Sequence, residues 1–88
     1  MTLKDYSFKD QITRASLSIP SNIAEGFEKE SNNEKSRYIE IAKGSSAELI
    51  TQVYIGIEIE YTEKATGMEW IKKLNDILRM LTGLKNNL

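Results

Sequence analysis

Apolar residues recur every three or four positions over most of the chain, which is the period of an amphipathic helix. One series begins near the N-terminus and runs through Phe8, Ile12, Ala15, Ile19, Ile23 and Phe27. Another closes the chain and runs through Leu74, Leu78, Leu81, Leu84 and Leu88. Each series lies along one side of a helix, so the pattern predicts an all-α fold with an amphipathic helix at each end of the chain.

Three segments begin with a serine or threonine that is followed three residues later by an acidic residue, the arrangement of a capping box. The pairs are Ser7 with Asp10, Ser31 with Glu34, and Thr66 with Glu69. Together with the apolar series they predict helices over residues 7–28, 32–61 and 67–86. Short polar connections between such helices are typical of an antiparallel up-down bundle.

The single proline, Pro20, lies inside the first of these segments. An interior proline removes a backbone donor and bends a helix. Because the apolar series keeps its spacing from Ile19 to Ile23, we expect one continuous helix with a kink at Pro20.

The middle segment is ambiguous, because residues 53–61 alternate between apolar and other residues as in a half-buried strand. No second run of this kind is available to pair with it, so helix is the better prediction. In a helix, Leu49 and Val53 lie on one side, whereas Ile55 and Ile59 lie on another. These two isoleucines are either ordinary exposed residues or an oligomer or partner face that packs on another helix, of another subunit or of a missing part of this chain, and we favour the packed face.

Length and composition limit the architecture. The 88 residues are enough for one domain, 1–88, and such a small core makes a lone monomer marginally stable. No apolar run approaches the ~18 residues of a membrane span, and the N-terminus lacks the basic-then-apolar order of a signal peptide. We therefore expect a cytoplasmic protein with no membrane partner.

The chain contains no histidine and no cysteine. Their absence removes the imidazole base, the thiolate nucleophile and the usual zinc ligands. Acidic pairs such as Glu58 and Glu60 are two residues apart, and such side chains point apart on a helix. We therefore expect no enzyme, no metal site and no cofactor.

If the first two helices are antiparallel, residues whose numbers sum to about 60 face each other. This rule places six small residues at a close helix crossing, namely Ala15, Ser16 and Ser18 against Ala42, Gly44 and Ser45. It also places Asn22 near the second helix and Arg14 near Glu48. We interpret Arg14 and Glu48 as an ion pair that sets helix register, the alternative being an exposed pair worth under ~1 kcal/mol.

Basic residues offer a second kind of candidate site. The candidate nucleic-acid contacts around the start of the second helix are Lys29, Lys35, Arg37 and Lys43. Acidic residues are interleaved with them, and the net charge is −1. This charge does not support binding to a polyanion.

Two sequence blocks resemble a known family. Residues 11–27 contain Ser-Ile-Pro-Ser-Asn-Ile-Ala-Glu-Gly, and residues 41–49 read Ile-Ala-Lys-Gly-Ser-Ser-Ala-Glu-Leu. They resemble the four-helix-bundle proteins encoded in bacterial 23S rRNA intervening sequences, which are related to the accessory bundle of diversity-generating retroelements. The resemblance implies a left-handed up-down bundle that assembles into closed homo-oligomers, with a pentamer as the expected number.

The chain departs from this family pattern in two respects, its net charge of −1, which is not that of a strong nucleic-acid binder, and its number of helices. Family members carry a further helix before the first block, whereas only Met1–Tyr6 precede the first predicted helix here. We therefore expect three helices of four and a groove that self-association or a partner helix closes. The favoured function is a non-catalytic homo-oligomeric scaffold or interaction module. The alternative is an RNA- or DNA-binding accessory protein that works with an rRNA or reverse-transcriptase system.

Overall fold

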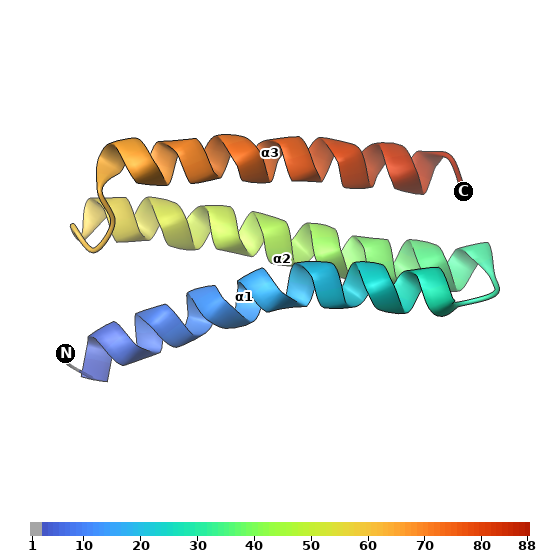
Figure 1. The fold of residues 1–88 in the computed structure, drawn as a ribbon, viewed down its shortest axis with the longest axis horizontal. Helices are drawn as coiled ribbons and strands as arrows, with labels where there is room; N and C mark the ends of the chain where they lie inside the picture. Colours follow the sequence, from blue (N-terminus) through green and yellow to red (C-terminus); the bar gives the residue numbers. More distant parts are fainter. Residues whose placement is uncertain (1–2) are drawn as a thin grey trace.

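The computed structural model describes residues 3–88, with side chains from residue 5 onward. Its three helices are α1 (Leu3–Glu28), α2 (Asn32–Glu58) and α3 (Lys64–Asn86). Over these residues there is no strand, so the helical prediction for the ambiguous middle segment is confirmed as far as Glu58. Figure 1 shows the chain turning back at each connection, so that α2 lies between α1 and α3.

Helix α1 is longer than predicted and begins at Leu3 instead of following Ser7. The proposed cap at Ser7 is wrong, because the helix already runs through this residue and Asp5 supplies the acidic group of its first turn. Pro20 lies inside α1, which continues to Glu28, so the prediction of one helix is confirmed. In Figure 1 the axis of α1 changes direction near its middle.

Helix α2 begins as its capping box predicts. The backbone N–H of Glu34 donates to Ser31 Oγ at 3.1 Å, and Ser31 Oγ donates to Glu34 Oε1 at 3.3 Å. Ser31 has extended backbone angles, as an N-cap residue requires. The local spacing of two residues was therefore enough to locate this helix start.

The C-terminus of α2 lies at Glu58, three residues before the predicted end. The N–H of Glu60 donates to the carbonyl of Ile57, and the N–H of Tyr61 donates to the carbonyl of Gly56. This pair of bonds is a Schellman motif, which requires a left-handed residue just after the helix. Glu60 fills that position with φ of 63°, although glycine is the usual residue there.

Glu60→Gly is expected to stabilise the fold by about 1 kcal/mol, because a left-handed backbone strains a residue that carries a Cβ. Urea unfolding followed by circular dichroism measures this change. Glu60→Ala is the matched control, since it removes the carboxylate and keeps the Cβ. Equal stabilities for the two variants contradict the prediction.

Helix α3 begins at Lys64, and its N-cap Glu63 makes no side-chain capping bond. The predicted cap at Thr66 is therefore wrong, because Thr66 already lies within the first turn. Gly67 is buried next to it, and the N–H of Gly67 donates to the carbonyl of Glu63. Tertiary packing of this turn against Ile57 of α2 accompanies the earlier start.

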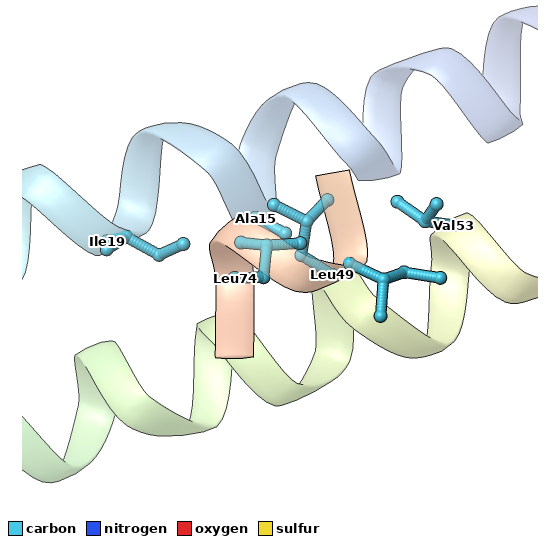
Figure 2. Close-up of a cluster of buried hydrophobic side chains, with 6 residues drawn as sticks. Ala15, Ile19, Leu49, Val53 and Leu74 are labelled. Atoms are coloured by element: carbon cyan, nitrogen blue, oxygen red, sulfur yellow. The ribbon is translucent and has the colours of Figure 1, made fainter. Parts of the chain in front are cut away.

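The core lies along the two sides of α2. Figure 2 shows Ala15 and Ile19 of α1 meeting Leu49 and Val53 of α2, with Leu74 reaching in from α3. A second cluster joins α2 to α3 near the far end and consists of Ile39, Ala42 and Leu81. The backbones of α1 and α3 do not approach each other closely. The molecule measures 44 × 24 × 13 Å and is therefore a thin layer of helices with α2 at its centre.

Candidate functional site

An apolar groove runs along one face of this layer, between α1 and α3. Its floor is formed by Leu49 and Val53 of α2. The wall supplied by α1 consists of Ile12, Ser16, Ile19, Pro20 and Ile23. The wall supplied by α3 consists of Trp70, Lys73, Leu74, Ile77, Met80 and Leu81. The groove exists because the backbones of both flanking helices approach α2 closely but do not approach each other.

Two adjoining hollows of about 320 and 540 Å³ make up this groove, and both are lined by Ser16, Leu49 and Leu74. Large apolar side chains remain in contact with solvent on its α3 wall. Trp70 is 45% exposed and Met80 is 66% exposed. Connected apolar surface of this kind on a small protein is typical of an interaction site.

The groove carries little charge. Lys73 is the one charged residue among those that line these two hollows, and its Nζ lies 3.6 Å from Glu69 Oε1. A further hollow continues the groove toward the N-terminus of α1, where Phe8 and Tyr61 meet edge to face with ring centroids 5.4 Å apart. An apolar trough with a charged rim favours the apolar side of another helix over a polar ligand.

The sequence patterns and the three-helix layer agree with one protein family. The family model for the 23S rRNA-intervening sequence protein matches residues 2–83. The chain belongs to this family. Comparison with curated proteins finds no match. The family's description states where its genes lie and names no reaction.

Both of the blocks that carried the resemblance contribute to the contact between α1 and α2. Ser18 Oγ and Ser45 Oγ lie 2.7 Å apart and share a hydrogen bond across the two helices. Ala15 and Ala42 are 6% and 0% exposed. Ser18 and Ser45 thus meet across the two helices, while Ala15 and Ala42 are buried in two different apolar clusters, Ala42 in the one that contains Leu81 of α3.

The other two members of the predicted crossing lie elsewhere. Gly44 is exposed, and a Cβ at this position would meet nothing within 4 Å. Ser16 is exposed on the groove, and its hydroxyl donates to the carbonyl of Ile12 within α1. The prediction was wrong for both because the numbering rule sets the position along a helix and not the rotation about its axis.

Three other glycines make the close approaches, and the sequence analysis did not single them out. A Cβ on Gly26 would lie 3.1 Å from Tyr38 Cβ, and one on Gly67 would lie 2.6 Å from Ile57 Cδ1. A Cβ on Gly56 would lie 2.7 Å from Phe8 Cζ. All three glycines are buried. The signal available in the sequence was the position of each glycine on the apolar side of its helix.

The predicted interhelical ion pair between Arg14 and Glu48 is wrong. Arg14 Nε lies 3.1 Å from Asp10 Oδ2, one turn earlier on the same helix, and both side chains are largely exposed. Glu48 Oε1 accepts from Gln52 Nε2 at 3.4 Å. Ion pairs four residues apart form within one helix without long-range alignment, which explains why the local partner is used.

Asn22 also has its partner on its own helix. Its Nδ2 donates to the carbonyl oxygen of Ser18 at 2.8 Å and to Ser18 Oγ at 3.0 Å. Because Ser18 in turn bonds Ser45, Asn22 supports the α1–α2 contact through a serine. The polar contact between these helices is therefore a chain of hydrogen bonds instead of an ion pair.

The predicted partner face, Ile55 and Ile59, is exposed on the surface. The two side chains are 49% and 46% exposed. Ile55 stands two residues from Val53 and hence about 160° around α2 from the groove floor. The structure thus has an exposed apolar pair on the back of the layer, apart from the groove that it forms on the front.

Acidic residues accompany two of the four candidate nucleic-acid contacts, Lys29 and Lys43. Lys29 Nζ lies 3.7 Å from Glu25 Oε2 and 5.3 Å from the centre of the Tyr38 ring. Lys43 Nζ lies 3.5 Å from Glu40 Oε1. The two remaining candidates, Lys35 and Arg37, lie on the first turns of α2, and Arg37 is exposed.

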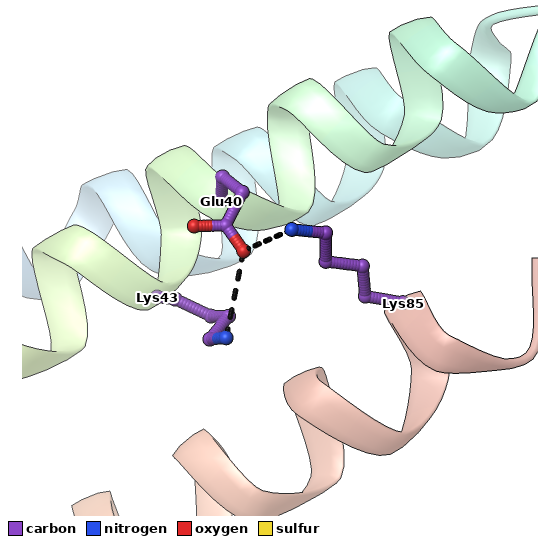
Figure 3. Close-up of polar contacts among 3 residues, drawn as sticks. All are labelled: Glu40, Lys43 and Lys85. Atoms are coloured by element: carbon purple, nitrogen blue, oxygen red, sulfur yellow. Dashed lines mark hydrogen bonds and ion pairs between the residues drawn. The ribbon is translucent and has the colours of Figure 1, made fainter.

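Figure 3 shows Glu40 between two lysines from different helices. Its Oε1 accepts from Lys85 Nζ of α3 at 2.6 Å and from Lys43 Nζ at 3.5 Å. The hydrogen bond from Lys85 holds the pKa of Glu40 below its usual value. This contact joins the surfaces of α2 and α3. It also places the carboxylate of Glu40 beside Lys43, one of the candidate nucleic-acid contacts.

Within residues 3–88, no group of three or more acidic side chains is arranged to hold a metal ion. None of the three described helices combines the length and the apolar character of a membrane span. The apolar groove between α1 and α3 is the candidate binding surface of the described residues.

Proposed function

We propose that this chain is a non-catalytic interaction module that works as a homo-oligomeric helical bundle. The apolar groove between α1 and α3 carries this proposal. It exposes Trp70 and Met80 to water, and covering such side chains stabilises an assembly by roughly 25 cal/mol per Å² of apolar surface removed from solvent. Because the core of this small domain lies on two sides of a single helix, burial of the groove in an assembly would add considerably to its stability.

The groove also fits the bundle architecture that the family resemblance implies. An antiparallel four-helix bundle has a helix at each corner of a square, and in this proposal α1, α2 and α3 would supply three of them. The position between α1 and α3, above Leu49 and Val53, is the one that a fourth helical surface occupies in such a bundle. The pentamer implied by the resemblance is one way to supply it.

The chemistry of the chain supports an interaction role over a reaction. Histidine and cysteine are absent from the sequence, and the groove walls carry one charged residue, Lys73. The net charge of −1 and the ion pairs of Lys29 and Lys43 argue against a nucleic acid as the main partner.

Light scattering after size exclusion tests this proposal. The expected mass is two or more times that of the 10.0 kDa chain. The assembly should dissociate on dilution, and the temperature of its thermal unfolding transition should fall at the same time. A protein that stays at 10.0 kDa at all concentrations and unfolds cooperatively contradicts it.

A further inference from the structure

Besides the groove, the chain has a polar hollow on the opposite side of α3, which we call the α2–α3 hollow. It has a volume of about 380 Å³, and Tyr54 is the residue that α2 contributes to it. The α3 residues that line it are Met68, Ile71, Lys72, Asn75, Asp76 and Arg79. Trp70 of the groove and Lys72 of this hollow are two residues apart, and hence about 160° apart around α3. The hollow and the groove are therefore separate surfaces.

The α2–α3 hollow combines an apolar floor with aromatic and polar walls. Ile71 is buried beneath it, whereas Tyr54 is 50% exposed and Met68 is 41% exposed. Small-molecule sites have volumes of ~300–1,000 Å³ and are built from apolar and aromatic side chains with a few polar groups. The exposed ring of Tyr54 offers a face on which a planar ring can stack. The hollow thus has the size and the wall of a site for a planar ligand.

The polar residues of the hollow stand in a row along α3. Lys72, Asn75 and Arg79 follow one another at steps of three and four residues, so they share one side of the helix. The row continues to Thr82, which lines an adjoining hollow of about 400 Å³ together with Asn75 and Arg79. All four side chains donate hydrogen bonds, and two of them are cations. Such a row suits a ligand with several acceptor oxygens and a negative charge, as a phosphate group has.

The charge of the hollow is positive, although the chain carries −1 overall. Two cations and one carboxylate, Asp76, line it. Arg79 Nη2 donates to Asp76 Oδ1, which orients the guanidinium group and leaves its other N–H donors for a ligand. Lys72 has no ion-pair partner among the described residues, so its ammonium group can pair with an anion.

We propose that the α2–α3 hollow binds a small planar ligand that carries a phosphate group, as a mononucleotide does. The ring of the ligand stacks on Tyr54, and its phosphate lies beside Asn75. Lys72 and Arg79 are two turns apart, about 10 Å along α3, so their long side chains can reach one phosphate from both sides. A nucleic-acid strand is the poorer occupant, because the hollow offers one ring for stacking and the net charge of −1 opposes a polyanion.

Titration of the full chain with adenosine monophosphate, followed by NMR of the ¹⁵N-labelled protein, tests the proposal. Saturable shifts are expected at Tyr54, Asn75 and Arg79. Lys72→Gln should weaken binding about tenfold through loss of a charge-assisted contact. Lys73→Gln is the matched control, because it makes the same change one residue away on the groove side and should leave binding unchanged. Both lysines are exposed, so each variant should keep its helical circular dichroism.

A second variant separates the contribution of the ring from that of the phosphate. Tyr54→Leu should weaken binding of adenosine monophosphate about tenfold and leave the weaker binding of inorganic phosphate unchanged. The absence of saturable shifts, or equal losses in Lys72→Gln and Lys73→Gln, overturns the site. Inorganic phosphate that binds as tightly as the nucleotide overturns the stacking role of Tyr54. A single-stranded oligouridylate that shifts the same residues at lower concentration overturns the choice of a small ligand.

Discussion

Leu74→Ala is expected to lower the free energy of unfolding by about 3 kcal/mol, the middle of the range for a buried leucine reduced to alanine. Leu74 is 7% exposed and is the α3 residue that Figure 2 shows reaching the cluster shared by α1 and α2. Since α1 and α3 have no close backbone contact, this cluster is where their side chains join one core. Urea unfolding at a fixed protein concentration measures the loss.

Leu17→Ala is the matched control for this prediction. Leu17 is 62% exposed on α1, so the same change of side chain there removes little buried surface. Its effect should stay within about 0.5 kcal/mol, as is usual for surface substitutions. Similar losses at both positions would show that the cluster around Leu74 does not hold the layer together.

Gly56→Ala is expected to destabilise the protein by about 2 kcal/mol, through overpacking that outweighs the better helix propensity of alanine. The new Cβ would lie 2.7 Å from Phe8 Cζ on α1 and 2.7 Å from Thr62 Oγ1 in the α2–α3 connection. Thr62 has little freedom to move away, because its N–H donates to the carbonyl of Gly56 at 3.0 Å. Thermal unfolding of the variant measures the effect.

Gly44→Ala is the control on the same helix and should change stability in the opposite direction. A Cβ at Gly44 meets nothing within 4 Å, so the substitution should stabilise the protein by about 1 kcal/mol through helix propensity alone. Destabilisation by Gly44→Ala would show that this position does pack closely, as the numbering rule had suggested.

Of the three capping boxes, which depend only on residues close together in the sequence, one was predicted correctly. The cap of α2 needs only Ser31 and Glu34, three residues apart, and it forms as expected. The same spacing at Ser7 and Thr66 did not mark helix starts, because α1 begins at Leu3 and α3 at Lys64. A capping residue competes with continuation of the helix, and packing of the added turn decides the outcome.

Features that depend on rotation about a helix axis were predicted less well. Ser18 and Ser45 meet as the antiparallel numbering rule requires, whereas Gly44 lies one residue from Ser45 and faces solvent. One residue corresponds to a rotation of about 100°, so an alignment that is correct along the helix can still select the wrong side. Arg14 was assigned to Glu48 by the same rule, and a partner on its own helix took precedence.

The order of residues along the chain was sufficient for the all-α class, the approximate helices and the family, because each depends on local periodicity or on contiguous residues. Tertiary structure alone decided that α1 and α3 both pack on α2 and leave Leu49 and Val53 as the floor of an open groove. The reason is geometric. Periodicity shows which side of each helix is apolar. The angle at which α1 and α3 are arranged around α2 decides whether the apolar side chains of these two helices cover each other or, like Trp70 and Met80, stay exposed to a partner.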